Sequence, residues 1–318
     1  EQVNPGLCKD AGLKLVYTPL NGAGRRSVLT VLGKMGITDI TVVPEQEWPD
    51  GNFPTCPYPN PEILEAMQKG LDLVEKLGAD LLLATDPDCD RLGCLVRAGD
   101  GSFIVLTGNQ IGCLLEHYVL SGRKAAGSLP ENGAVVKSIV STDMAKAIAA
   151  SFGVETFNVL TGFKFIAEKI QQFEDTGSHE FLFGFEESYG FLAGTFVRDK
   201  DAVIASMLLA EAAAWYKKRG MTLYEGLMAL YDAYGCYSEK VTSITLEGKD
   251  GLEKMATLMR GLRAHTPAQF AGVPVKAILD YQEGTRTENG VSTPLDFPAS
   301  NVLFYELEGD AWVCIRPS

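Results

Sequence analysis

Basic residues are scarce in this 318-residue sequence: 28 Lys and Arg stand against 41 Asp and Glu, giving a net charge of −13. A general nucleic-acid binder needs a basic face, so we expect no nucleic-acid partner. Long apolar runs are also lacking, because Ser206 and Glu211 interrupt the longest one, Ala202–Trp215. We therefore expect no membrane span. The sequence has 46% hydrophobic residues, which is ordinary for a globular protein.

Paired cysteine motifs and catalytic histidine motifs are absent as well. No C-x-x-C occurs, and the cysteines are odd in number: Cys8, Cys56, Cys89, Cys94, Cys113, Cys236 and Cys314. Neither a disulfide framework nor a zinc site is indicated, and with no leader-like N-terminal pattern we expect a cytoplasmic protein. The sequence contains no G-x-x-x-x-G-K-[ST] and no G-x-S-x-G, which argues against a P-loop NTPase and an α/β-hydrolase.

Strands alternate with helices over the first two thirds of the chain, which is typical of parallel sheets with helical crossovers. We expect two consecutive three-layer α/β/α domains with mixed sheets, at 1–105 and 106–234. A truncated α+β domain is expected at 235–318. Among the expected elements are a helix from Pro61 to about Leu77 and an exposed, alternating strand over Cys236–Leu246.

Three carboxylates at alternate positions follow the apolar strand Asp80–Ala84, in the run TDPDCDR. Alternate side chains of an extended loop share one side, so Asp86, Asp88 and Asp90 are expected to converge. Converging carboxylates repel one another unless a cation lies between them, and oxygen ligands suit Mg²⁺. Arg91 adds a guanidinium that can grip a phosphate with two hydrogen bonds. A solvated acidic turn is the plainer alternative. An EF-hand is excluded, because its sixth position would be Arg91 rather than Gly.

A second polar loop, GFEESYG, follows the apolar strand Glu180–Phe183. Its glycines permit a tight turn and the close approach of a ligand. Glu186 and Ser188 are two residues apart and could bind the vicinal hydroxyls of a sugar, although a capped turn explains the pattern equally well. Cations lie near two expected helix starts, at Lys164 and at Arg198 to Lys200, where surface ion pairs are the alternative.

Taken together, these loops resemble those of the α-D-phosphohexomutase family, which includes phosphoglucomutases and phosphomannomutases. The resemblance extends over nearly the whole chain. It rests on five runs: PDGNFPTCPYPNPE, TDPDCDRLG, TGFKFI, GFEESYG and VRDKDA. The family has four domains, and this chain would match the second, the third and much of the fourth.

The resemblance implies a role for each matching residue. Asp86, Asp88 and Asp90 would bind Mg²⁺, and Arg91 would lie beside the transferred phosphoryl group. Glu186 and Ser188 would hold sugar hydroxyls, Thr161 and Gly162 would line the sugar site, and Lys200 would lie close to the substrate. Arg316 and Ser318 match the start of the family's phosphate loop, R-P-S-G-T-E-P. The implied partner is a small sugar phosphate, with a sugar 1,6-bisphosphate as activator of the parent enzyme.

The family's catalytic serine lies in an S-H-N-P-type loop of its first domain, and this sequence has no such loop. Its only Ser-His pair, Ser178-His179, is followed by Glu180-Phe181. We therefore expect a fragment of a phosphohexomutase, foremost a phosphoglucomutase, that lacks the N-terminal domain of the same protein. We expect the isolated chain to be inactive and to bind Mg²⁺ weakly. The alternatives are a phosphopentomutase or phosphomannomutase, a non-catalytic sugar-phosphate binding module, and a D-x-D nucleotide-sugar transferase.

Overall fold

The structure is a computed structural model that describes residues 2–317. The chain forms two compact units, residues 1–238 and residues 239–318, and each is described by itself. Within the described residues, no helix has both the length and the apolar character needed to cross a bilayer.

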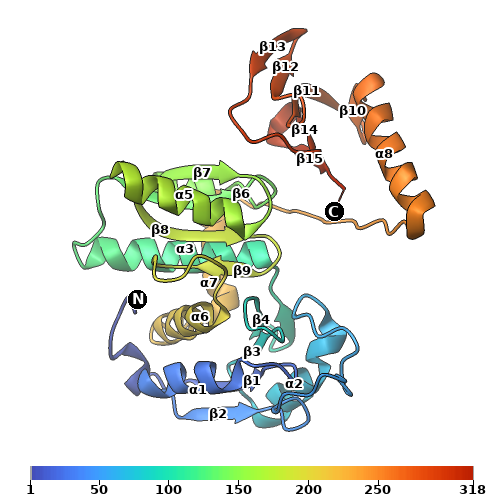
Figure 1. Cartoon of the computed structure of the whole chain (residues 1–318). Coiled ribbons are helices and arrows are strands. Elements are labelled where there is room, and N and C mark those ends of the chain that lie inside the picture. The colour runs from blue at the N-terminus through green and yellow to red at the C-terminus, as the bar shows by residue number, and fades with distance from the viewer. Residues whose placement is uncertain (1, 318) are drawn as a thin grey trace. The chain divides into compact units, whose positions relative to one another are not determined.

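The first sheet of unit 1 has the strand order β2-β1-β3-β4-β5 (Figure 1). Strands β1 (Lys14–Thr18), β2 (Asp39–Val42) and β3 (Leu81–Thr85) are parallel, whereas β4 (Leu92–Arg97) and β5 (Phe103–Val105) form an antiparallel hairpin. Alternate residues of β3 belong to different buried clusters: Leu82 shares one with Met67 of α2 (Leu64–Leu77), and Leu83 shares the other with Leu32 of α1 (Arg25–Lys34). A fully buried strand of this kind needs helices on both sides.

The second sheet repeats this plan with the order β7-β6-β8-β9. Strands β6 (Gly133–Ser138), β7 (Glu155–Val159) and β8 (Glu180–Glu186) are parallel, and β9 (Gly190–Leu192) pairs antiparallel with β8. One face contacts α3 (Gly108–Ala125) and the other contacts α5 (Phe163–Thr176), while α4 (Met144–Ser151) packs on α3 and β7. Both sheets are therefore mixed and form α/β/α layers, as expected.

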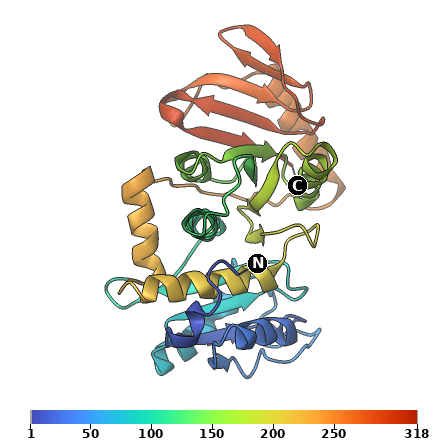
Figure 2. The ribbon, with the colours of Figure 1, turned by 90° about the vertical axis from the view of Figure 1, so that its left-hand side faces the viewer.

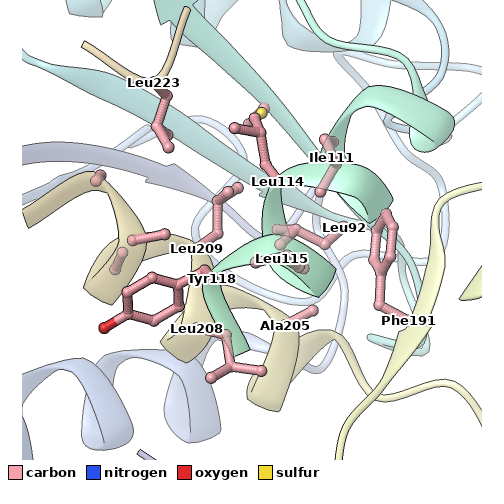
Figure 3. Packing of buried hydrophobic residues seen from close by; sticks show 14 of the residues in the cluster. Leu92, Ile111, Leu114, Leu115, Tyr118, Phe191, Ala205, Leu208, Leu209 and Leu223 are labelled. Atoms are coloured by element: carbon pink, nitrogen blue, oxygen red, sulfur yellow. The ribbon is translucent and has the colours of Figure 1, made fainter. Parts of the chain in front are cut away.

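Helix α6 (Ala202–Lys217) joins the two layered parts of unit 1. It contacts α1 of the first part and α3 of the second, and Figures 1 and 2 both place it between them. Leu208 and Leu209 of α6 belong to one buried cluster with Leu114 and Leu115 of α3 and Leu92 of β4 (Figure 3). Helix α7 (Leu223–Tyr234) adds Leu223 to the same cluster. A continuous apolar core thus fixes the two sheets relative to each other.

Two elements differ from the sequence-based expectation. Helix α2 begins at Leu64, not at Pro61, because residues 60–63 form a turn in which the amide of Ile63 donates to the carbonyl of Asn60. The strand expected over Cys236–Leu246 is absent: the segment has no secondary structure, and Val241 and Ile244 stay exposed. Alternation alone does not make a strand, since a strand also needs a partner for its hydrogen bonds and a face to bury.

Unit 2 is an α+β arrangement, as expected. Helix α8 (Gly248–Ala264) supplies Met259 to a small core with Leu303 and Tyr305. The antiparallel sheet has the order β13-β12-β11-β14-β15, with β10 paired to β11. Its strands are β10 (Gln269–Phe270), β11 (Val273–Asp280), β12 (Thr285–Glu288), β13 (Val291–Pro294), β14 (Leu303–Leu307) and β15 (Trp312–Ile315).

Candidate active site

The acidic loop that follows β3 gathers its three carboxylates in a small volume. One oxygen from each of Asp86, Asp88 and Asp90 lies within 4.8 Å of the other two. The loop is a turn and not the extended segment expected from the sequence, since Cys89 has a φ of 63°. Asp86 organises this turn, because its Oδ1 accepts hydrogen bonds from the amides of Asp90 (3.0 Å) and Arg91 (2.9 Å).

The negative charges of this loop are close together and partly buried, which favours the binding of a cation. Burial raises the pKa of Asp86 to about 7. The Arg91 backbone hydrogen bond works against this shift, and the charges of Asp90 and Asp88 add to it. A divalent cation would relieve the repulsion, and a set made only of carboxylate oxygens suits a hard cation such as Mg²⁺. The residues present therefore fit the metal that the sequence predicted.

Arg91 lies at the edge of the acidic loop. Its Nε is 3.9 Å from Oδ2 of Asp86 and 3.8 Å from Oδ1 of Asp90, while its Nη1 pairs with Oε1 of Glu62 at 3.1 Å. About a third of its side chain is exposed, so the guanidinium is held beside the carboxylates and still accessible to a ligand. Glu62, which the sequence analysis did not single out, thereby orients this cation.

The segment after β1 packs directly against the backbone of the acidic loop. A Cβ at Gly22 would lie 2.3 Å from Cα of Pro87, and the amide of Ala23 donates to the Pro87 carbonyl at 2.8 Å. Asn21 fixes this segment in turn, because its Nδ2 donates to the carbonyls of Glu45 (3.2 Å) and Trp48 (2.9 Å). Residues far apart in the sequence thus position the acidic loop.

The second polar loop follows β8 and turns back at once into β9. Glu186 is buried at the end of β8, and its Oε1 accepts the amide of Gly162 at 2.6 Å. Tyr189 closes the turn with a φ of 65°. Burial raises the pKa of Glu186, which the Gly162 amide opposes. Glu186 and Gly162 therefore meet, as the sequence-based assignment requires, next to the half-exposed Thr161 and Ser188.

The two loops are joined directly. The amide of Leu92 donates to the carbonyl of Tyr189 at 3.0 Å, and Arg91 forms an isolated antiparallel bridge with Gly190. Lys200 completes the junction: its Nζ is 2.8 Å from Oδ2 of Asp90 and 3.3 Å from Oδ1 of Asp199. Burial lowers the pKa of Lys200, but its hydrogen bond to Asp90 and the nearby acidic charges raise it overall. The lysine therefore stays a cation between the two loops.

The remaining expected site residues are not all at this junction. Arg198 pairs with Glu174, and Lys164 lies over the ring of Phe165 with its Nζ 4.9 Å from the centroid, so each of these cations has a partner near its own position. Asp201 caps α6 by accepting the amides of Val203 and Ile204. Arg316 belongs to unit 2, and Ser318 lies outside the described residues.

Two layered α/β parts thus bring the acidic loop against the second polar loop, which is the arrangement that a phosphosugar-processing class of protein would need. Comparison with known families gives the same result. The model for phosphoglucomutase/phosphomannomutase α/β/α domain II matches residues 2–99, and that for domain III matches residues 107–234. The chain belongs to the phosphoglucomutase/phosphomannomutase family, the α-D-phosphohexomutases.

Curated relatives agree with this placement. The chain is 37% identical over 315 residues to a phosphoglucomutase of Staphylococcus aureus (strain MRSA252), and 37% identical over 316 residues to one of Staphylococcus epidermidis (strain ATCC 12228 / FDA PCI 1200). Each match covers 98% of this chain and 56% of the relative, so the chain spans about half the length of these relatives.

Solved structures share the fold. A putative phosphomannomutase from Thermus thermophilus matches with a TM-score of 0.62 at 19% identity, covering 98% of this chain and 59% of that one. The open form of parafusin, a phosphoglucomutase from Paramecium, matches with a TM-score of 0.61 at 17% identity, covering 99% and 52%. At these identities the likeness concerns the fold alone.

Proposed function

We propose that this chain forms the metal- and sugar-binding part of a phosphoglucomutase, which interconverts hexose 1-phosphate and hexose 6-phosphate. In this reaction class a phosphoserine donates its phosphoryl group to the sugar phosphate, and a bisphosphate intermediate returns the other phosphate to the serine. The bisphosphate also serves as the activator. The proposed domains are residues 1–105, 106–234 and 235–318. The odd number of cysteines and the lack of a C-x-x-C pair in the sequence support a reducing, cytoplasmic location.

The observation that carries the proposal is the direct bonding of the two loops: the Leu92 amide donates to the Tyr189 carbonyl and Arg91 forms a bridge with Gly190, with the Lys200–Asp90 ion pair beside them. Three carboxylates that could hold a cation thereby lie next to a carboxylate and a hydroxyl that could bind a sugar, which supports the proposal. Phosphoryl transfer depends mainly on positioning and on neutralising charge, which this arrangement supplies. Either feature alone would suit many proteins, whereas a ligand that carries both phosphate and hydroxyls fits their combination.

Each side chain then has a specific task. Asp86, Asp88 and Asp90 would hold Mg²⁺, which when bound neutralises charge on the transferred phosphoryl group. Arg91 would hydrogen-bond oxygens of that group, and Lys200 would neutralise substrate charge. Glu186 would accept hydrogen bonds from sugar hydroxyls. Ser188 could both donate hydrogen bonds to them and accept hydrogen bonds from them, and Thr161 and Gly162 would line the sugar site. Arg316 and Ser318 would contribute to binding the second phosphate.

Ligand-observed NMR on the chain with Mg²⁺ tests this proposal. The ligands are glucose 1-phosphate, mannose 1-phosphate, ribose 1-phosphate and UDP-glucose. We expect saturation transfer to glucose 1-phosphate first, its loss in Glu186→Ala, and its retention in Glu180→Ala, a change at the opposite, exposed end of β8. Preference for mannose or ribose phosphate would reassign the substrate. Binding of UDP-glucose alone would replace the proposal with a nucleotide-sugar transferase.

A further inference from the structure

Glu187 separates the two proposed sugar-binding residues of the loop, Glu186 and Ser188, but its own side chain has a partner inside the protein. Its Oε2 accepts a hydrogen bond of 2.8 Å from Oγ of Ser138. Ser138 is the last residue of β6 and is fully buried. The central residue of the loop is therefore attached to the end of the neighbouring parallel strand.

Ser138 is itself fixed in orientation. Its Oγ lies 2.9 Å from Oγ of Ser141. A serine hydroxyl carries a single hydrogen, so Ser138, which donates to Glu187, must accept from Ser141. The hydrogen bonds therefore run in one direction, from Ser141 to Ser138 and from Ser138 to Glu187.

The turn that carries Ser141 is held by a buried lysine. Lys137 is 1% exposed, and its Nζ donates to the carbonyl of Ser141 at 3.0 Å and pairs with Oδ1 of Asp143 at 3.2 Å. From the other side, Oδ1 of Asn109 on α3 accepts the amide of Thr142 at 3.1 Å. The turn after β6 is thus a rigid support for the Ser138 hydroxyl.

The backbone of the sugar loop rests on the start of α3. A Cβ at Gly108 would lie 2.1 Å from the carbonyl oxygen of Glu187 and 2.8 Å from the amide nitrogen of Tyr189. Only a glycine allows this approach of helix and loop. Residues 187–189 are therefore fixed by contact with α3 as well as by the Ser138 hydrogen bond.

We propose that Ser138 and Glu187 are a positioning pair that locks the sugar loop, so that Glu186 and Ser188 are held ready for the sugar hydroxyls. The inference rests on the proposed function for its consequence on binding, although the lock itself does not depend on that function. A loop ordered before the ligand arrives avoids the entropy cost of ordering it during binding. Glu187 acts through the loop and does not touch the sugar.

Amide hydrogen exchange measured by NMR tests the lock without any ligand. Two amides report on the loop: that of Gly162, which donates to Glu186, and that of Leu92, which donates to Tyr189. We expect Ser138→Ala and Glu187→Ala each to speed exchange at both amides about ten-fold, as the loss of one buried hydrogen bond implies. The double variant should show exchange no faster than that of Glu187→Ala.

Two further variants serve as controls. The conservative Glu187→Gln, which can still accept a hydrogen bond from Ser138, should restore most of the protection, and the matched control Glu180→Ala should change the exchange of neither amide. Unchanged exchange in Ser138→Ala would overturn the lock.

The dissociation constant of glucose 1-phosphate with Mg²⁺ then tests what the lock does. We expect Ser138→Ala and Glu187→Ala to weaken binding by similar factors of about ten, without further loss in the double variant. Weaker binding in Glu187→Ala but not in Ser138→Ala would mean that Glu187 touches the sugar, which overturns the proposal. Faster exchange with unchanged binding would overturn it too. If the unaltered chain binds no sugar phosphate, the proposed function fails, and the exchange data still decide whether the pair locks the loop.

Discussion

Nζ of Lys200 lies 2.8 Å from Oδ2 of Asp90, so a cation from the segment before α6 neutralises one carboxylate of the acidic loop. The start of α6 is bonded to the acidic loop and to β9, because the amide of Ala202 donates to the Cys89 carbonyl and that of Asp201 donates to the Phe191 carbonyl. We therefore expect Lys200 to compete with a metal ion for Asp90. A negatively charged substrate that draws Lys200 away should then favour metal binding.

Replacing this lysine should tighten metal binding in the absence of phosphate. We expect Lys200→Met to lower the Mg²⁺ dissociation constant several-fold by calorimetry, because it removes a positive charge from the metal site. In the unaltered chain we expect binding much weaker than micromolar, since Mg²⁺ in proteins usually relies on phosphate or water oxygens as well.

Lys217→Met is the matched control for this measurement. Lys217 forms an equivalent 2.8 Å ion pair with Asp80, at the opposite end of β3. The Lys217→Met variant should leave the Mg²⁺ affinity unchanged. Equal affinities in the unaltered chain and Lys200→Met would show that Lys200 does not compete for Asp90.

The contact between Gly22 and Pro87 should be essential for the metal loop. Gly22→Ala would place a methyl group 2.3 Å from backbone Cα, so the acidic loop must shift. We expect the free energy of unfolding in urea to fall by about 1–3 kcal/mol, the usual cost of overpacking, with weaker Mg²⁺ binding. Gly33→Ala on the exposed face of α1 meets nothing within 4 Å and should be neutral or stabilising by up to about 1 kcal/mol. Similar effects of the two substitutions would refute the role of this contact.

Glu116 in α3 should make the stability of unit 1 depend on pH. It is fully buried, its burial raises its pKa well above the usual range, and only the charge of Lys137 and the backbone of Ala149 act against this shift. A carboxyl whose pKa is raised by folding stabilises the fold at low pH, and this contribution is lost as pH rises from the unfolded pKa through the folded one.

The isosteric Glu116→Gln does not titrate and isolates this effect. We expect the unaltered chain to lose stability relative to the variant above pH about 4.5, by at most about 1.4 kcal/mol per pH unit for one proton. Urea unfolding of both proteins at several pH values measures the difference. If the difference in unfolding free energy between the two proteins did not change with pH, the pKa of Glu116 would not be raised by folding.

The chain alone should not turn over glucose 1-phosphate, because its 318 residues contain no S-H-N-P-type loop. Phosphorus NMR of the chain with glucose 1-phosphate, glucose 1,6-bisphosphate and Mg²⁺ should show no glucose 6-phosphate beyond the protein-free control. Turnover that disappears in Glu186→Ala would place a nucleophile within these residues.

The sequence predicts the parts of the site that are contiguous, and the structure supplies the contacts between them. Asp86, Asp88 and Asp90 lie in one run directly after a buried strand, so their convergence could be foreseen, although a left-handed turn at Cys89 and not an extended loop produces it. The ion pair of Lys200 with Asp90 has no local signal, because it depends on how α6 packs between the two sheets.

Support residues were equally hidden in the sequence. Ser138 and Glu187 are 49 residues apart and meet only because β6 and β8 are neighbouring parallel strands. The strand expected at Cys236–Leu246 failed for the converse reason: a local alternation was present, but no partner strand pairs with this described segment. Local pattern therefore finds elements and loops, while pairing between distant segments decides which of them form a site.

Paramagnetic relaxation by Mn²⁺ tests most directly whether metal and sugar share one site. Mn²⁺ is also a hard cation that accepts carboxylate oxygens, so it should replace Mg²⁺ between Asp86, Asp88 and Asp90. We expect the sugar protons of glucose 1-phosphate to relax much faster with Mn²⁺ and the chain than with Mn²⁺ alone. This enhancement should vanish in Asp88→Asn and in Glu186→Ala, and persist in Glu180→Ala. Enhancement that survives both of the first two substitutions, or that never exceeds the protein-free level, would contradict a joint metal and sugar site.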